Sequence, residues 1–409
     1  MVEEIKNDTI QKPKRDINRI LVRNESFGGI LFNQQTGTTI MIDSEGFKTL
    51  VKAVYKKSLS KEETTFLRNL IPDPIYKEIK ILFDPSIKII EDPPLITSTP
   101  ILIDLSLNNQ CNEQCSFCYM SSKPNGHGES IAMEDINILI KMMKHARVFQ
   151  IALGGGEPTL HPEFPKILKK LRLEADVIPN YTTNGSTLNR EILLASKKYC
   201  GAVAVSYNKH RFNETLIAAE KLRKASIKTN VHIVLLRENI PQILNIIKEY
   251  ARIGISGVVL LLFKPMGRGS TLRNQIIRLE DENNLAKELI KITAFCQSKK
   301  ITLHYDACSA PLIRKLPYLA ESIDGCNGAR YSCYVDLNLR AKPCSFMQNK
   351  QGIDLHSIGL KKAWNSPFFL EFRRTLLRRR FVGCKKCDYF TSCWGGCPII
   401  PEIAICSDK

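Results

Sequence analysis

Six short apolar runs alternate with six helix-like segments between residues 101 and 299, and this alternation restricts the fold more than any other feature of the sequence. The runs are rich in β-branched and aliphatic residues, which is typical of buried strands. They are Ile101–Leu107, Phe149–Leu153, Val177–Tyr181, Ala202–Ser206, Asn230–Leu235 and Val258–Phe263, and the helical segments lie near 132–146, 163–172, 189–199, 213–225, 239–253 and 280–299. Strands that alternate with helices form a parallel sheet with right-handed crossovers. The sequence therefore predicts an α/β fold centred on a curved, partial TIM-like (β/α)6 barrel.

Three closely spaced cysteines, Cys111, Cys115 and Cys118, follow the first predicted strand. In such a barrel ligands bind at the carboxyl ends of the strands, so the triplet lies where a ligand is expected. Three thiolates hold three corners of a four-iron cluster and leave one iron open to a ligand. A zinc site with a fourth ligand, for which His127 is the nearby candidate, and plain buried cysteines are the alternatives from this triplet alone.

The triplet, with a phenylalanine before its last cysteine, resembles the CxxxCxΦC signature of the radical S-adenosylmethionine (radical SAM) superfamily. The resemblance implies a [4Fe-4S] cluster that binds S-adenosylmethionine, and reductive cleavage of this cofactor to a 5′-deoxyadenosyl radical. It also implies that Gly155, Gly156 and Glu157, which match the family's GGE motif, bind the methionine amino group. Asn184, in a Thr-Asn-Gly turn, and Ser206, at the end of the fourth strand, match positions near the adenosine and the ribose.

Eight of the fourteen cysteines lie between residues 326 and 406. Their spacing resembles the SPASM extension of radical SAM enzymes, which binds two further [4Fe-4S] clusters. The resemblance assigns Cys326, Cys344 and Cys397 to the first auxiliary cluster, and Cys384, Cys387, Cys393 and Cys406 to the second. It leaves Cys333 as a candidate that closes the first cluster, and a pair of zinc ribbons is the alternative by spacing alone. Cys200, Cys296 and Cys308 have no partner spacing, so no ligand role is expected for them.

A hairpin followed by helices is predicted over about residues 19–90. The predicted strands are Phe27–Asn33 and Thr38–Ile42, and the predicted helices are Glu45–Tyr55, a second that begins near Ser60, and Pro74–Leu82. This order resembles the winged-helix-like peptide-recognition element of ribosomal-peptide maturation enzymes, where a leader peptide adds as a strand to a sheet edge. A purely structural cap is the alternative. We therefore expect three domains, at residues 1–95, 96–305 and 306–409.

The formal net charge is +18, and five arginines gather between residues 373 and 380. Because no RNP, KH or helix-turn-helix pattern is present, we favour a solvated basic face or a groove for an acidic peptide over nucleic-acid binding. The first 18 residues lack the apolar stretch of a signal peptide, and no apolar run is long enough to span a membrane. The expectation is a cytoplasmic protein whose cysteines are reduced and bind metal.

The resemblance implies a radical SAM oxidoreductase that modifies a ribosomally synthesised peptide, for example by crosslinking it. Expected partners are the precursor peptide with its leader and an electron donor of the flavodoxin or ferredoxin type. Alternatives are protein side-chain oxidation, as in anaerobic sulfatase maturation, modification of a cofactor precursor, or a non-enzymatic electron carrier or redox-sensing nucleic-acid binder. The general base stays open among Asp306, Asp336 and Glu129. Lys264 and Arg268 are either ligands for an anionic group or simple loop charges.

Overall fold

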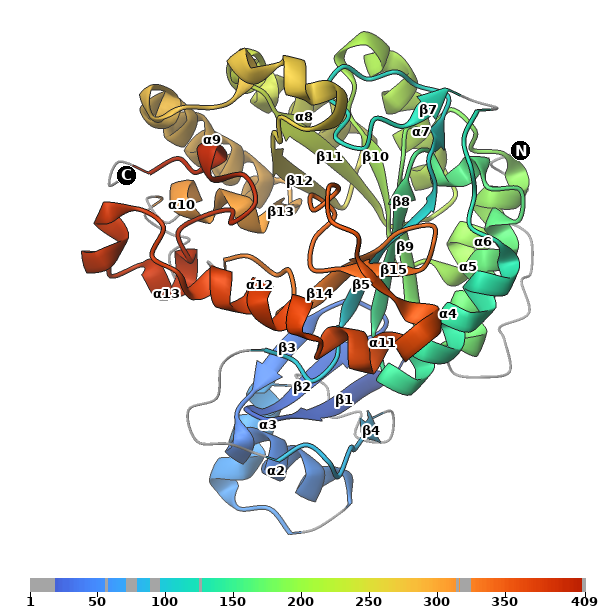
Figure 1. Cartoon of the computed structure of the whole chain (residues 1–409), viewed down its shortest axis with the longest axis vertical. Coiled ribbons are helices and arrows are strands. Elements are labelled where there is room, and N and C mark those ends of the chain that lie inside the picture. Colours follow the sequence, from blue (N-terminus) through green and yellow to red (C-terminus); the bar gives the residue numbers. More distant parts are fainter. Residues whose placement is uncertain are drawn as a thin grey trace.

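A ten-stranded sheet forms the centre of the protein (Figure 1). The computed structural model describes residues 19–55, 58–70, 79–88, 96–124, 127–313, 316 and 325–406. The strand order is β13-β12-β11-β10-β9-β8-β5-β14-β15-β16. The strands are β5 (Leu102–Asn108), β8 (Gln150–Gly155), β9 (Ile178–Thr183), β10 (Val203–Ser206), β11 (Thr229–Leu235), β12 (Gly257–Leu262), β13 (Thr302–Tyr305), β14 (Ser332–Val335), β15 (Arg340–Lys342) and β16 (Ile353–Asp354).

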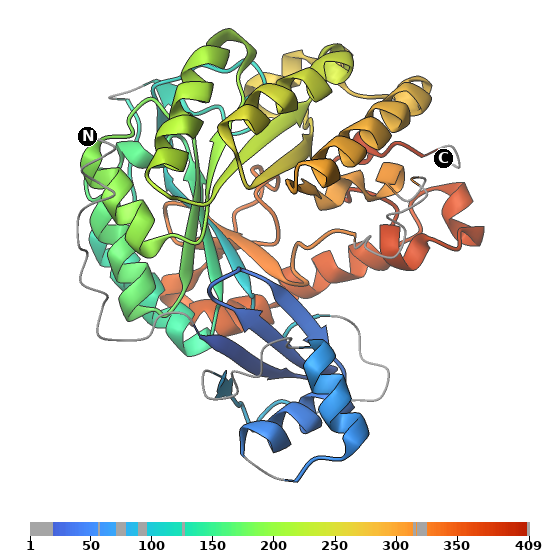
Figure 2. The ribbon, with the colours of Figure 1, turned by 180° about the vertical axis from the view of Figure 1, so that it is seen from behind.

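Six helices cover the outer side of this curved sheet (Figures 1 and 2). They are α4 (Met133–Ala146), α5 (Phe164–Glu174), α6 (Arg190–Tyr199), α7 (Phe212–Lys224), α8 (Ile243–Ile253) and α9 (Glu282–Ser298). The predicted α/β partial barrel is therefore confirmed. One boundary differs, because Pro241 lies in a short 3₁₀ turn and the α-helix begins only at Ile243. Proline lacks the N–H that an α-helix interior requires.

Alternating burial along the strands separates a core side from a cavity side. In β11 every second residue, from Thr229 to Leu235, is buried, and the residues between them are half-buried. The buried side packs against the helices, because successive strand side chains point to opposite faces. The other side, with Asn230 and His232, borders cavities inside the barrel. The inner face is thus free to hold ligands.

The N-terminal module has a four-stranded sheet of order β3-β2-β1-β4 packed against two helices. The elements are β1 (Ile20–Glu25), β2 (Gly28–Asn33), β3 (Thr39–Ile42), α2 (Ser44–Val54), α3 (Lys61–Leu70) and β4 (Ile79–Leu82). The predicted hairpin and first two helices are present, and Asp43 caps α2 by accepting a hydrogen bond from Gly46 N. The predicted third helix is wrong over residues 79–82, which form β4 alongside β1, and residues 71–78 lie outside the described part.

This module shares a hydrophobic core with the barrel floor. Phe32 stacks on Phe149 with ring centroids 5.0 Å apart. Arg23 of β1 is buried, forms an ion pair with Glu25 and donates hydrogen bonds to Thr99 Oγ1 (2.8 Å) and to the Arg147 carbonyl (2.9 Å). Breaking such a buried pair costs about 3–5 kcal/mol. The module therefore packs tightly on the barrel, and its deletion would uncover part of the barrel core.

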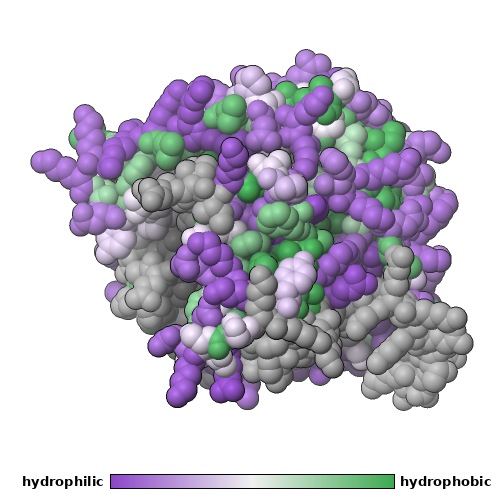
Figure 3. Space-filling view, turned by 90° about the horizontal axis from the view of Figure 1, so that it is seen from below, coloured by the Kyte–Doolittle hydropathy of each residue, from purple (hydrophilic) through white to green (hydrophobic). Residues whose placement is uncertain are grey.

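The cysteine-rich C-terminal segment completes the barrel sheet, because β14 pairs in parallel with β5. Its other main elements are α11 (Leu355–Trp364), α12 (Pro367–Leu377), the 3₁₀ helix η10 (Val382–Lys386) and α13 (Phe390–Cys393). Seen from the side of the N-terminal module, the surface is mostly hydrophilic, with smaller hydrophobic patches (Figure 3). Within the described residues, none of the helices is long and apolar enough to cross a membrane.

Candidate active site and cysteine groups

One cavity of about 520 Å³ opens at the carboxyl ends of the barrel strands. All predicted ligands of the catalytic cluster and of its cofactor line it, and they are Cys111, Cys115, Cys118, Gly155, Gly156, Glu157, Asn184 and Ser206. They lie at the ends of four different strands or in the loops that follow them, which the parallel sheet brings to one edge.

The loop that carries the cysteine triplet is held by Arg268. Its guanidinium donates hydrogen bonds to the carbonyls of Cys115 (3.0 Å) and Ser122 (2.8 Å). Two roles were considered for Arg268, a ligand for an anionic group and a loop charge. The structure shows its guanidinium bonded to the backbone of the cysteine loop. Burial raises the pKa of the Cys111 thiol to about 11. Without a metal this thiol is protonated at neutral pH, and coordination of a metal ion would deprotonate it.

The GGE turn packs directly against the cysteine loop. Gly156 N donates to the Asn108 carbonyl (2.8 Å), and Glu157 N donates to the Gln110 carbonyl (2.9 Å). A Cβ at Gly156 would lie 1.8 Å from the Gln110 oxygen, so a larger residue cannot occupy this position without moving the loop. The glycine is required because two backbone segments approach closely here.

The Glu157 carboxylate is occupied within the protein. It accepts hydrogen bonds from Thr183 Oγ1 (2.8 Å), from Asn184 N (2.7 Å) and from the backbone and hydroxyl of Thr159. Burial raises the pKa of this carboxyl group, while these hydrogen bonds lower it. The sequence predicts this carboxylate as a contact for the methionine amino group. The structure places Glu157 in the cavity lining with Gly154, Gly155 and Gly156, and its hydrogen bonds also connect the segments that follow the second and third strands.

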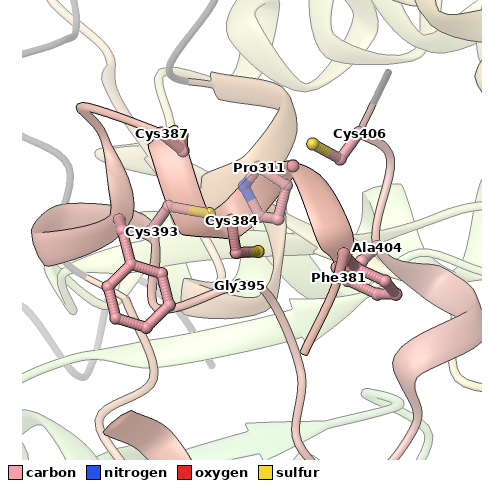
Figure 4. Close-up of a pocket in the computed structure, with 10 residues that line it drawn as sticks. Pro311, Phe381, Cys384, Cys387, Cys393, Gly395, Ala404 and Cys406 are labelled. Atoms are coloured by element: carbon pink, nitrogen blue, oxygen red, sulfur yellow. The ribbon is translucent and has the colours of Figure 1, made fainter. Parts of the chain in front are cut away.

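A second cavity is lined by four cysteines of the C-terminal segment, Cys384, Cys387, Cys393 and Cys406 (Figure 4). These are the residues that the sequence assigned to the second auxiliary cluster. Phe381, Phe390 and Pro311 complete the walls. Four thiols in an apolar cavity match the ligand set of a [4Fe-4S] cluster. Among the described residues, no three His, Cys, Asp or Glu side chains converge on a single-ion site.

A third group of cysteines contains a member that the sequence did not predict. Cys308 lies in the 3₁₀ helix η8 (Ala307–Ser309) and forms a hydrogen bond with Cys397, which raises the pKa of Cys308 and lowers the pKa of Cys397. Burial raises the pKa of Cys326 to about 12, and Cys308 contributes to this shift. Cys344 interacts with both Cys326 and Cys308. These interactions place the four thiols in one group, although Cys308 lies 18 positions before Cys326 in the sequence.

Cys333 lies away from this group. It is fully buried in β14, where it pairs with Ile103 and belongs to the hydrophobic core. The next residue, Tyr334, borders the large cavity. Because neighbouring strand residues point to opposite faces, Cys333 points into the helix-covered core. The structure thus places Cys308, and not Cys333, beside the three cysteines predicted for the first auxiliary cluster.

Three of the four carboxyl groups in the large cavity have partners. Glu113 pairs with Arg211, Glu157 is braced as described, and Asp306 pairs with Lys264. Asp306, one of the candidate bases, also accepts hydrogen bonds from Leu262 N and Ser309 Oγ. The other two candidates lie outside the residues that line this cavity: Asp336 holds a β-turn, and Glu129 is exposed.

Asp104 of β5 is the exception, and sequence reasoning missed it because it lies inside a predicted buried strand. No hydrogen bond or ion pair with the described residues is found for its carboxyl group, which borders the cavity. Burial raises the pKa of Asp104 to about 6. Tyr119 and Tyr334 lie near it, but their hydroxyls bond to Ser345 and Ser106. An unpaired carboxyl group in a cavity indicates a functional role.

Comparison with known proteins agrees with this geometry. The Radical SAM superfamily profile matches residues 105–250. The AdoMet-dependent heme synthase of Oleidesulfovibrio alaskensis is 22% identical over 328 residues, which cover 72% of this chain and 82% of that protein. Mycofactocin maturase MftC of Mycobacterium tuberculosis (strain ATCC 25618 / H37Rv) is 25% identical over 319 residues, which cover 73% and 78%. The structure of Streptococcus suis SuiB bound to its precursor peptide SuiA superposes with a TM-score of 0.70, at 18% identity, over 95% of this chain and 98% of that one.

Residues 105–250 therefore form a domain that matches the Radical SAM superfamily. The chain is related to peptide maturases and shares its fold, over nearly the whole length, with SuiB. Proteins of this family use S-adenosylmethionine and a [4Fe-4S] cluster, and the thiols and glycine turn around the large cavity fit both groups.

Gly154 offers a direct test of where S-adenosylmethionine binds. A Cβ at this position meets no atom within 4 Å, so it would project into the cavity. Gly154→Ala is expected to weaken S-adenosylmethionine binding about tenfold or more, because an added methyl in a packed site costs about 1–3 kcal/mol. Calorimetric titration of the anaerobic protein measures this. Gly156→Ala is the contrasting variant and should instead lower iron content, since its methyl would displace the cysteine loop. Unchanged affinity in Gly154→Ala would contradict the placement.

Proposed function

We propose that this protein is a radical SAM enzyme that oxidatively matures a ribosomally synthesised peptide, using one catalytic and two auxiliary [4Fe-4S] clusters. The observation that supports this most is the combination, in one chain, of the large cavity, two further cysteine groups and a docked module whose sheet ends at β3. The relation to MftC and the shared fold with peptide-bound SuiB support the same proposal.

The proposed ligands follow from the three cysteine groups. The catalytic cluster is held by Cys111, Cys115 and Cys118, and the second auxiliary cluster by Cys384, Cys387, Cys393 and Cys406. For the first auxiliary cluster we propose Cys326, Cys344, Cys397 and, as the fourth ligand, Cys308. When bound, the catalytic cluster and S-adenosylmethionine supply a 5′-deoxyadenosyl radical that takes one hydrogen atom from the substrate.

The peptide loses two hydrogens in all. The radical takes one of them as a hydrogen atom, so one proton and one electron must still leave the substrate. Auxiliary clusters bound at the two C-terminal cysteine groups would supply an acceptor for this electron, and an external donor of the flavodoxin or ferredoxin type would supply the electron that starts each cycle. We propose Asp104 as the acceptor of the proton, since it borders the cavity and its carboxylate has no other partner among the described residues.

Asp104→Asn is therefore expected to lower product formation about 10²- to 10⁴-fold while 5′-deoxyadenosine still forms. In the wild type, product formation should rise as the pH passes through about 6, where the carboxyl group ionises.

The stability of the wild type should change with pH in the opposite direction. Because the folded-state pKa is raised, folding binds a proton between pH 4 and 6, and the wild type loses stability as the pH rises through this range. Thermal unfolding should therefore show that Asp104→Asn is more stable, relative to the wild type, at pH 8 than at pH 4. Glu129→Gln, an exposed carboxyl-to-amide change, is the control. Equal product yields in wild type and Asp104→Asn would exclude the role.

The leader peptide is proposed to add to β3, which lies at one end of the module sheet. Asn33 N donates to the Thr38 carbonyl, so Thr38 and Ile40 bond inward to β2, and Thr39 N–H points outward in the alternating ladder. Among the described residues, no strand pairs with this side of β3, so its outward backbone groups are the proposed partners of an incoming strand, as β-augmentation requires.

The test uses the full chain and synthetic versions of short peptides encoded next to its gene. The expected results are leader-dependent binding and, with S-adenosylmethionine and dithionite under anaerobic conditions, a peptide that has lost two hydrogens. Thr39→Pro removes the outward N–H and should abolish leader binding, whereas Thr39→Ala keeps it and should bind normally. Deleting the module is less informative, because it would uncover Phe149 and Ile178 of the barrel core. If 5′-deoxyadenosine forms but no peptide binds or changes mass, the peptide substrate is excluded and a cofactor precursor becomes the favoured substrate class, given the heme synthase relative.

A further inference from the structure

Arg380 follows α12 in the C-terminal segment, and its guanidinium is half-buried and bonded to backbone carbonyls. It donates hydrogen bonds to the carbonyls of Thr375 (2.8 Å), Gly396 (2.7 Å), Gly395 (3.2 Å) and Trp394. These partners are neutral, so the hydrogen bonds hold the guanidinium in place without neutralising its charge.

The position of this cation is unusual, because it adjoins both auxiliary cysteine groups. The turn from Trp394 to Gly396 joins Cys393, a member of one group, to Cys397, a member of the other. A Cβ at Gly395 would lie 3.4 Å from Cys384 Sγ and 3.7 Å from Arg380 Nε and Nη2. The guanidinium and the Cys384 sulfur therefore both lie beside Gly395.

The electrostatics agree with this placement. Burial lowers the pKa of Arg380, and negative charge on four cysteines opposes that shift. Two of them, Cys397 and Cys326, belong to the proposed first auxiliary cluster, and the other two, Cys384 and Cys393, belong to the second. By contrast, the neighbouring Arg378 pairs with Glu371 on the surface. Arg379 stacks on Phe390 and donates a hydrogen bond to the Cys384 carbonyl.

We propose that Arg380 is a shared counter-ion of the two auxiliary clusters and raises the reduction potential of both. The proposal depends on the cluster assignment made above. A [4Fe-4S] cluster with four thiolate ligands carries a net negative charge, which increases by one when the cluster is reduced. A fixed cation nearby stabilises the more negative form, and it does so strongly where water is partly excluded. Arg380 thereby helps both clusters to accept the electron released from the substrate.

The experiment isolates the auxiliary clusters by replacing Cys111, Cys115 and Cys118 with alanine in the full-length chain. EPR-monitored redox titration then gives the midpoint potential of each remaining cluster. In this background Arg380→Gln is expected to decrease the reduced-to-oxidised ratio of both clusters about tenfold at a fixed potential, which corresponds to 59 mV for one electron. Arg380→Lys keeps the charge and should restore most of the difference. Arg378→Gln removes a surface charge from the same arginine run and should change neither potential.

Unchanged potentials in Arg380→Gln, or a change in only one cluster, would overturn the shared role. If Arg380→Gln loses iron, the lysine variant decides between the two roles. Normal iron and near-normal potentials in Arg380→Lys support the counter-ion, whereas equal iron loss in both variants shows that Arg380 only holds the turn. Failure of the cluster assignment itself is visible earlier, because the background protein would then contain far fewer than about eight irons, the content of two four-iron clusters.

Discussion

Alanine at position 118 is expected to abolish 5′-deoxyadenosine formation, with a loss of at least about 10³-fold, while two-thirds of the iron remains. Cys118 and its two partners line the large cavity, and two thiolates cannot hold a four-iron cluster that also binds S-adenosylmethionine. The auxiliary groups lie in other parts of the chain and should load normally. Iron content should therefore fall from about twelve to about eight atoms per chain.

The matched control for this variant is Cys200→Ala. Cys200 follows α6 and is fully separate from the three cysteine groups in the sequence, and burial raises the pKa of its thiol, as expected for an inert residue. It should retain full iron content and full activity. Iron and sulfide analysis with chromatographic detection of 5′-deoxyadenosine measures both outcomes. Residual cleavage of S-adenosylmethionine in Cys118→Ala would show that the catalytic cluster lies elsewhere.

Cys308→Ala and Cys333→Ala are expected to have opposite effects. Cys308 contacts Cys397, so its removal should open one iron of the first auxiliary cluster, change that cluster's EPR signal and allow an added small thiol or cyanide to bind. Peptide modification should fall at least about tenfold, since this cluster is the proposed electron acceptor. Cys333 lies in the core, so its removal should leave all the iron in place and lower the free energy of unfolding by about 1–2 kcal/mol.

Comparison of the two variants decides whether Cys308 or Cys333 is the fourth ligand of the first auxiliary cluster. EPR spectra with and without cyanide, together with thermal unfolding of each variant, distinguish a lost ligand from a lost core contact. If Cys333→Ala exposes an iron and Cys308→Ala does not, the proposed ligand set is wrong and the residue left open by the spacing pattern is the true ligand.

The strands that sequence analysis does not predict are those whose side chains or backbones contact distant segments of the chain. β1 was not predicted, because its second half carries Arg23, Asn24 and Glu25, which normally indicate exposure. These residues are buried where the module docks on the barrel floor. Likewise, β4 was assigned to a helix, although its residues Ile79–Leu82 gain their partners from β1. Strand pairing of this kind depends on contacts with distant segments, which local propensity does not report.

The sequence by itself determined the barrel and the location of its site. Apolar periodicity identifies the strands, and parallel strands bring the residues that follow them to one edge of the sheet. The sequence therefore predicts that Cys111 and Glu157 lie at the same cavity, as the structure shows. Only the tertiary structure decided what those residues contact. Among the described residues, it places hydrogen-bond donors around Glu157, a hydrogen bond between Cys308 and Cys397, no hydrogen-bond partner at Asp104, and Arg380 at the turn between two cysteine groups. The physical reason is that burial, charge and hydrogen bonding depend on which distant segments pack together. The apolar periodicity of a strand or helix, in contrast, depends only on neighbouring residues in the sequence.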